Sequence, residues 1–180
     1  MRKRARKTAE GVLILDDKDL RILDVLQKQG RITLRELARK VGSPVTTVHS
    51  RVKRLEKAGI IRAYRAVLSP EKLGLKTLAF VLVSFSGESG VSQREVARKI
   101  ADLPEVQEVH IITGTWDILV KVRVSDVEDL GRFVIDKIRA IPGVEKTLTC
   151  VVLDTLKETM SINVRSVGQG ETTIIRQEEG

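Results

Sequence analysis

The sequence predicts an α+β protein of two domains that differ in charge and in secondary structure. Residues 1–76 carry 20 Lys and Arg against 8 Asp and Glu, a net charge of +12, and their apolar residues recur at helical spacing. Residues 77–180 carry 12 basic against 16 acidic residues, a net charge of −4, and alternate β-rich runs with capped helical segments. We therefore expect a helical N-terminal domain followed by a domain of the order strand-helix-strand-strand-helix-strand.

The composition limits the classes of protein to which the chain can belong. With 42% hydrophobic residues among 180, it can build a packed core. The single cysteine, Cys150, excludes a disulfide framework within one chain and fits a reducing interior. The longest apolar run, residues 78–83, is far shorter than the ~20 residues of a membrane span, and residues 12–15 are too short for a signal peptide. We expect a cytoplasmic protein with no membrane partner.

Two short helices open the basic half. Asp16 or Asp17 caps the first, whose leucines share one face, and Gly30 supplies its left-handed C-cap. A Thr33–Glu36 capping box starts the second, and Gly42 ends it. Both helices present an apolar stripe that must pack against a third element.

The third predicted helix runs from Pro44 to Ala58, with Ser43 as its cap and Pro44 at the first helical position. Four apolar residues share the face that packs on the first two helices: Val45, Val48, Val52 and Leu55. Two short helices, a tight glycine-containing turn and a third helix with a basic outer face make a helix-turn-helix. The alternative for this segment is a small helical bundle with a solvated basic surface.

The outer face of the third helix is suited to double-stranded DNA, because early helix residues approach base edges and later basic ones meet phosphates. The candidate DNA-binding residues are Thr46, Thr47, His49, Ser50, Arg51, Lys53, Arg54 and Lys57. His49 either touches DNA or sits at the edge of the packed face. Arg51 also has a structural part, because it borders the buried stripe.

The second half predicts a ferredoxin-like domain with both helices on one face of a sheet. The strands are expected at residues 78–86, 106–113, 118–124 and 144–153. Capping boxes start the two helices, Ser92 with Glu95 and Ser125 with Glu128. The second helix carries four apolar residues on one side: Val127, Leu130, Val134 and Ile138. The other sheet face still carries Val and Leu, and a second copy of the chain is its simplest cover.

Over about residues 15–158 the chain resembles the Lrp/AsnC family, the leucine-responsive or feast/famine regulators. The motifs that carry the resemblance are Leu15–Leu23, Gly30–Thr33, Arg51–Ile61, Gly114–Asp117 and Pro142–Val144 followed by Thr147 and Thr149. The resemblance implies a winged-type helix-turn-helix and a C-terminal regulatory domain of the amino-acid-metabolism (RAM) type, which is ACT-like. It also implies a homodimer, with dimers often assembled into a tetramer or octamer.

The expected domain organisation has five parts. They are a basic N-terminal extension (1–14), the helix-turn-helix domain (15–62), a linker strand and hinge (63–76), the RAM-type effector-binding and oligomerisation domain (77–158) and a C-terminal tail (159–180). Residues 60–68 are a candidate additional strand, and the tail beyond Val164 is expected to be mobile. Both extensions depart from the family, as does Ser43–Thr46 at the head of the third helix, so no DNA code is transferred.

The resemblance further implies an amino acid or related small effector at the seam between dimers, near a Gly-x-x-Asp turn. The candidate effector-binding residues are Thr113, Gly114, Thr115, Trp116 and Asp117. The Asp117 carboxylate can accept from an α-ammonium group, and backbone near Gly114 can approach a ligand closely. Alternatively, Gly114 only makes the turn, Asp117 caps it and Trp116 fills an oligomer interface.

An enzyme is not expected, and neither a catalytic site, a metal site nor a cofactor is predicted. Cys150 and the separated His49 and His110 lack zinc-site spacing, and the chain has no Gly-rich phosphate loop or nucleophile elbow. Aromatic residues, 3% of the chain, are too few for a single-strand stacking platform. The sequence predicts a sequence-specific DNA-binding transcriptional regulator modulated by a small effector. The open alternative is a ligand-independent architectural DNA-binding protein of the same fold.

Overall fold

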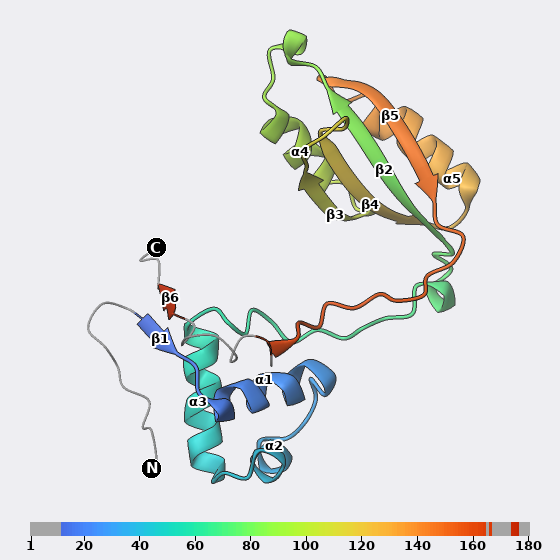
Figure 1. Cartoon of the computed structure of the whole chain (residues 1–180). Helices are drawn as coiled ribbons and strands as arrows, with labels where there is room; N and C mark the ends of the chain where they lie inside the picture. Colours follow the sequence, from blue (N-terminus) through green and yellow to red (C-terminus); the bar gives the residue numbers. More distant parts are fainter. Residues whose placement is uncertain (1–11, 165, 167–173, 177–180) are drawn as a thin grey trace. The chain divides into compact units, whose positions relative to one another are not determined.

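The computed structural model of the chain describes residues 12–164, 166 and 174–176 and divides into two compact units (Figure 1). The first unit comprises Met1–Val67 together with Thr159–Gly180, and the second is Leu68–Glu158. The chain therefore passes from the first unit to the second and back again. Each unit has its own hydrophobic core.

The first unit contains the three predicted helices, α1 (Asp17–Lys28), α2 (Leu34–Val41) and α3 (Val45–Lys57). Asp16 caps α1 by accepting from two backbone N–H groups of the first turn, and Thr33 caps α2 within a capping box. These side chains satisfy N–H groups that have no partner inside the helix. Both predicted caps are confirmed.

Two predicted helix ends are wrong. The C-cap of α1 is Gln29, with φ −141°, and Gly30 is not in the left-handed region. Pro44 precedes α3 with φ −58° and ψ 146°, so it takes the N-cap place instead of the first helical position, and no side chain caps this helix. Ser43 therefore lies outside the helix, where its Oγ accepts from Lys18 Nζ at 2.8 Å.

The core of the first unit lies where the three helices meet. Its buried members on the helices are Ile22, Leu23, Leu37, Ala38, Val41, Val48, Val52 and Leu55. Val45 does not join them and is 41% exposed, because it is the first residue of α3 and precedes the buried stripe. Val164, from the C-terminal segment, does join this core.

The second unit is built on a four-stranded antiparallel sheet in the order β3-β4-β2-β5. Its strands are β2 (Thr77–Phe85), β3 (Val106–Ile111), β4 (Ile118–Val124) and β5 (Val144–Val151). In this order the first strand of the domain lies between the third and the fourth, which is the ferredoxin-like arrangement. The predicted topology is confirmed, with strand ends shifted by up to two residues.

Two helical segments cover one face of this sheet (Figure 1): α4 (Gln93–Ala101), and α5 (Val127–Arg132), which continues as a π-helical segment η3 (Phe133–Ile138). Apolar side chains from both segments and from one face of β2 and β4 form a single core. The opposite face of the sheet carries no helix of the second unit.

The caps of these helices match the prediction at α4 and differ at α5. Ser92 caps α4 in a capping box with Glu95. At α5 the cap is Asp126, whose side chain accepts from a backbone N–H, and not Ser125. Because the helix starts one residue later than predicted, Val127 is its first residue and lies 64% exposed instead of facing the core.

The connecting segments contain two short 3-10 turns, η1 (Glu71–Leu73) and η2 (Gly87–Ser89). No strand forms over residues 60–68 of this chain, so the additional strand predicted there is absent. An extended segment of a single chain has no partner for its backbone groups unless another strand lies beside it.

The two ends of the described chain pair with each other in the first unit. Strand β1 (Val12–Ile14) is antiparallel to β6 (Ile174–Arg176). The expectation of a mobile tail therefore does not hold for Ile174–Arg176. Most of the tail beyond Val164, and the basic N-terminal extension before Val12, lie outside the described residues.

Candidate functional site

The outer face of α3 carries polar and basic side chains at helical spacing. The predicted DNA-binding residues that are exposed here are Thr46, His49, Ser50, Lys53 and Lys57. Thr47 is half-buried, and its carbonyl oxygen accepts a hydrogen bond from Ser50 Oγ at 2.9 Å. That bond uses the hydroxyl hydrogen of Ser50, so its oxygen remains free to accept from the exocyclic amine of a base.

The other two predicted DNA-binding residues, Arg51 and Arg54, reach the first turn of α1 instead. Arg51 Nη1 lies 2.7 Å from Asp16 Oδ1 and 2.9 Å from Asp19 Oδ1, and Arg54 Nη2 lies 2.6 Å from Asp19 Oδ2. The Asp19 side chain is 0% exposed. These ion pairs fasten α3 to the start of α1 and so fix the rotation of α3 about its own axis.

The ion pairs keep Asp16 and Arg51 charged. Burial raises the pKa of Asp16, but hydrogen bonds from the Asp19 backbone N–H and from Arg51 outweigh it, and the pKa lies below its ordinary value. Burial lowers the pKa of Arg51, and hydrogen bonds to Asp16 and Asp19 more than reverse this effect. A charged pair that links two helices is well suited to hold the exposed face of α3 in place.

Sequence reasoning missed a second basic surface, on α2. Arg35, Arg39 and Lys40 are exposed there, and Lys40 Nζ donates to Gln29 Oε1 at 2.9 Å. In a helix-turn-helix the first of the two paired helices crosses the phosphate backbone. The helical spacing of these cations was visible in the sequence and is the signal that could have found them.

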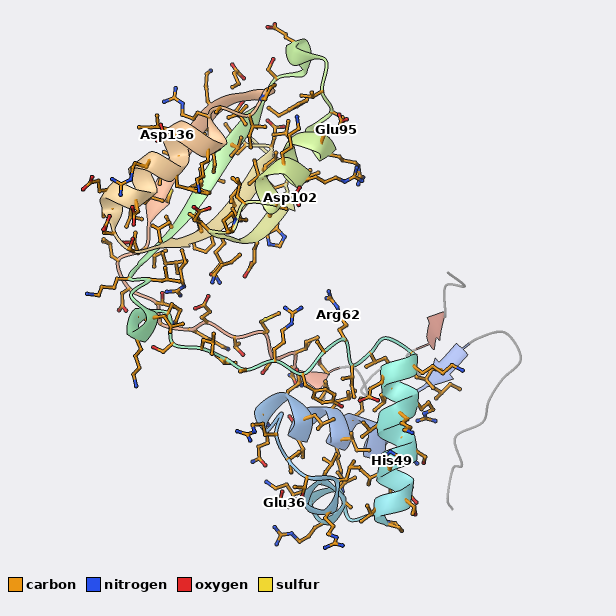
Figure 2. All side chains as sticks on the ribbon, turned by 180° about the vertical axis from the view of Figure 1, so that it is seen from behind. Glu36, His49, Arg62, Glu95, Asp102 and Asp136 are labelled. Carbon is orange, nitrogen blue, oxygen red and sulfur yellow. The ribbon has the colours of Figure 1, made fainter. Side chains whose placement is uncertain are left out.

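His49 lies on α3 (Figure 2) and is exposed, and it also lines a hollow of about 300 Å³ with Tyr64 and apolar residues of α1 and α2. Tyr64 donates to Glu56 Oε1 at 2.9 Å, and burial together with this carboxylate raises the pKa of Tyr64 to about 12. The position of His49 therefore fits both interpretations, a DNA contact and an edge of the packed face.

The Gly-x-x-Asp turn lies between β3 and β4. Thr113, Gly114 and Thr115 are exposed, and Trp116 is half-buried. Gly114 has φ +119°, a conformation that residues with a side chain rarely adopt. The turn requires a glycine here, whether or not a ligand also approaches it.

Asp117 fastens the turn to the neighbouring strand. Its Oδ2 accepts from the Phe85 N–H at 2.8 Å, its own N–H donates to the Val83 carbonyl at 3.0 Å, and Gln93 Nε2 lies 3.4 Å from Oδ1. A carboxylate can accept about four hydrogen bonds, so these contacts leave capacity for a ligand donor. The predicted effector residues lie together in one turn. Asp117 also has a structural role, because its contacts hold this turn against β2.

The sheet face opposite the helices, called the open face below, has an apolar centre beside the charged Lys121 and Arg123 of β4. Phe80, Leu82 and Leu119 are half-buried, Leu148 is 45% exposed and Cys150 is exposed. Strand register places these residues together, because Leu82 lies between Leu119 and Leu148, and Phe80 pairs with Cys150. Apolar surface of this kind on a globular unit marks an interaction site.

The described part of the chain contains no group of three or more His, Cys, Asp and Glu side chains placed to hold a metal ion. Among the same residues, no helix has the length and apolar character needed to cross a membrane.

Comparison with known families assigns each unit. Residues 15–62 match the family model of the winged helix-turn-helix DNA-binding domain, and residues 78–162 match that of the Lrp/AsnC ligand binding domain. An uncharacterized helix-turn-helix (HTH)-type transcriptional regulator of Pyrococcus abyssi is 49% identical over 145 residues, which cover 81% of this chain and 97% of the relative. The HTH-type transcriptional regulator FL11 of Pyrococcus furiosus is 41% identical over 152 residues, covering 84% and 98%.

Solved structures of related regulators support the same assignment. A transcriptional regulator of Neisseria meningitidis in complex with L-Met has a TM-score of 0.80 at 35% identity and covers 85% of this chain and 99% of its own. AsnC of E. coli has a TM-score of 0.75 at 30% identity, covering 82% and 98%. These matches confirm the predicted α+β fold and the predicted DNA-binding helix-turn-helix joined to a ligand-binding domain. They also confirm the prediction of a transcriptional regulator, since the matched family consists of regulators and not of enzymes. The chain belongs to the Lrp/AsnC family of transcriptional regulators.

Proposed function

We propose that this regulator binds specific sequences of double-stranded DNA as a dimer, each subunit placing α3 in the major groove of one half-site. The observation that carries the proposal is the exposed row of hydroxyl and basic side chains on α3. The ion pairs of Arg51 and Arg54 with Asp19 hold that row outward. Two such helices would meet half-sites about one DNA turn apart, or a multiple of it. Binding to chromosomal DNA would also fit the expected cytoplasmic location.

In this proposal the residues of α3 have different roles in DNA binding. Thr46, Thr47 and Ser50, near the start of the helix, are proposed to meet base edges, and Lys53 and Lys57, one turn apart, to meet phosphates. Arg51 and Arg54 act first as positioning residues that tie α3 to α1. His49 is proposed to lie at the margin of the DNA contact, beside the hollow that it lines.

The open face of the sheet, opposite the helices, offers a surface for the proposed dimer. Its apolar centre, formed by Phe80, Leu82, Leu119, Leu148 and Cys150, would be covered by the same face of a second copy. In an interface with two-fold symmetry both subunits contribute the same patch, so one patch is enough to form a closed dimer. Further association of dimers into a tetramer or octamer is part of the proposal.

Replacing Leu148 by Asp should break this dimer. The change puts two carboxylates into one apolar interface, and we expect the dimer dissociation constant to rise roughly a hundredfold or more. Sedimentation velocity over a concentration series measures it. Ile135→Asp is the matched control, since Ile135 is 62% exposed on η3, away from the open face. A Leu148→Asp protein with the same assembly as the Ile135→Asp protein would contradict the proposed interface.

We also propose that an amino acid or a related small molecule binds at the seam between dimers, near Gly114 and Asp117, and changes the assembly or the spacing of the DNA-binding units. The L-Met complex of the Neisseria meningitidis regulator supports an amino-acid effector. The exposed Thr113 and Thr115, the half-buried Trp116 and the free capacity of the Asp117 carboxylate suit such a ligand. The second candidate is an architectural DNA-binding protein without a ligand, favoured by the structural contacts of Asp117.

A titration with the twenty amino acids, L-methionine first, tests the effector while melting temperature and particle size are followed. We expect at least one to raise the melting temperature by several degrees at saturation. Asp117→Asn keeps an acceptor for the Phe85 N–H but loses the charge, so it should remove the ligand shift while the unit stays folded. Asp136→Asn, an exposed site on η3 (Figure 2), should leave the shift intact. No response to any amino acid would favour the architectural protein.

A further inference from the structure

The C-terminal segment of the chain contributes a buried side chain to the core of the first unit. Residues from Thr159 onward belong to that unit. Val164 is 9% exposed and joins the cluster of buried residues from α1, α2 and α3. It lies beyond residue 162, where the match to the family model ends. A residue of the C-terminal extension therefore completes the core of this helix-turn-helix.

Gln27 of α1 binds the backbone of the same segment, which lies beside this helix (Figure 1). Its Nε2 donates to the Ile162 carbonyl at 3.1 Å, and its Oε1 accepts from the Ile162 N–H at 2.6 Å. One side chain thus satisfies both backbone polar groups of Ile162. The Ile162 side chain is 73% exposed, so this contact recognises the main chain and not the side chain.

A tight turn joins the Gln27 contact to the buried side chain. The Ile162 carbonyl also accepts from the Val164 N–H at 2.9 Å, so both of its lone pairs are used. Ser166 Oγ donates to the Asn163 carbonyl at 2.7 Å. The turn places the Val164 side chain in the core within two residues of the backbone that Gln27 holds. A two-point amide contact and one buried apolar side chain together define a small site for a peptide segment.

The C-terminal extension contacts the first unit at a second place, through β6. This strand pairs with β1, and Leu13 of β1 packs against the same core as Val164. Strand β1 precedes residue 15 and β6 follows residue 162, so both lie outside the residues that match the family models. The two extensions of this chain are therefore joined to each other on the first unit.

The position of α1 matters for α3. The first turn of α1 holds Asp19, the buried carboxylate that pairs with Arg51 and Arg54. Gln27 lies at the other end of the same helix. An isolated helix of 12 residues is marginal in water, so α1 depends on its packing. A segment docked near the end of α1 therefore also restrains the carboxylate at its start.

We propose that α1 carries a docking site for residues 162–164 of the same chain, built from the Gln27 amide and the apolar core that receives Val164. While the site is occupied, α1 stays in place and Asp19 keeps α3 oriented for DNA. The consequence for DNA rests on the proposed function, whereas the docking does not. The C-terminal extension is then a structural part of the helix-turn-helix, although it follows the ligand-binding domain in the sequence.

Hydrogen exchange of the full-length protein tests the docking. Val164→Asp places an unpaired carboxylate against the core, and the amides of residues 20–28 should then exchange at least about tenfold faster, whereas those of β2 and β4 stay unchanged. Met160→Asp is the matched control, because it adds the same charge to the same segment at a side chain that is 90% exposed. Equal exchange in residues 20–28 of both variants would overturn the docking site.

Two milder variants decide the question if Val164→Asp unfolds the first unit. Val164→Ala removes apolar contact and leaves the backbone contacts, whereas Gln27→Met keeps the length of the side chain and loses both hydrogen bonds to Ile162. Each should raise exchange in residues 20–28 about threefold or more, and the double variant should raise it further. Exchange that neither variant alters would show that residues 162–164 are not docked on α1.

DNA binding tests the consequence for α3. In fluorescence anisotropy with duplexes of selected and of random sequence, Val164→Asp should bind at least about fivefold more weakly than Met160→Asp, which has the same net charge. Faster exchange with unchanged affinity would leave the docking and overturn its link to α3. A wild type that binds neither duplex would refute the proposed DNA binding, and the exchange experiment would still decide the docking.

Discussion

Replacing Lys53 and Lys57 together by Ala should weaken binding to every DNA sequence about tenfold or more at physiological salt, and should lower the slope of log affinity against log salt by about 2. Both side chains are exposed one turn apart on α3. Each phosphate that a lysine neutralises releases condensed counterions, so the loss is largest in dilute salt and carries no base preference. Fluorescence anisotropy with specific and random duplexes over a salt series measures both quantities.

The matched control removes two exposed cations from the second unit. Arg98→Ala with Lys99→Ala on α4 makes the same change in net charge. If this pair and the Lys53 and Lys57 pair reduce affinity equally, only net charge matters, and α3 is not the DNA-binding face.

Asp19→Asn should destabilise the first unit by about 3 kcal/mol, the lower end of the range for breaking a buried ion pair. The change leaves Arg51 and Arg54 without their shared partner. We take the lower end because the Arg54 side chain is 33% exposed, so water screens part of its charge. Urea unfolding can follow each unit by itself, because the single Tyr, Tyr64, lies in the first unit and the single Trp, Trp116, in the second.

Asp17→Asn is the control for this change. Asp17 is exposed in the first turn of α1, so removing the same charge there should cost only a few tenths of a kcal/mol. The Trp116 transition should not move in either protein. A Tyr64 transition that shifts equally in both proteins would refute a structural role for the buried carboxylate, and with it the proposed positioning of α3.

Local chemistry made much of the fold readable from the sequence. Capping side chains lie within three residues of the N–H groups they satisfy. For this reason Thr33 and Ser92 were predicted correctly, and the cap of α1 was narrowed to Asp16 or Asp17, of which the structure has Asp16. Strand and helix periods are also local, and their order restricts the topologies of an antiparallel sheet to a few. The error at Ser125 arose because the adjacent Asp126 competes for the same cap. The error at Ser43 has another cause, because its hydroxyl accepts from Lys18 and no side chain caps α3.

Only part of the candidate site could be predicted from the sequence. The sequence placed the basic helix and the Gly114–Asp117 turn, because each is a contiguous segment whose pattern is complete in itself. It did not show that Arg51 and Arg54 reach Asp19, since those partners lie 32 and 35 residues away and meet only when α3 packs on α1. The same holds for Asp117 and the Phe85 N–H, which β-strand register brings together.

By itself the sequence determined the α+β class, the two-domain order, the position of α3 and the excess of positive charge around it, because these follow from composition and from periods of a few residues. The tertiary structure alone decided which cations of α3 remain exposed and which are taken by Asp19. It alone decided that Val164 enters the core of the first unit. Both depend on which distant segments the packed core brings within contact, and no local pattern encodes that distance.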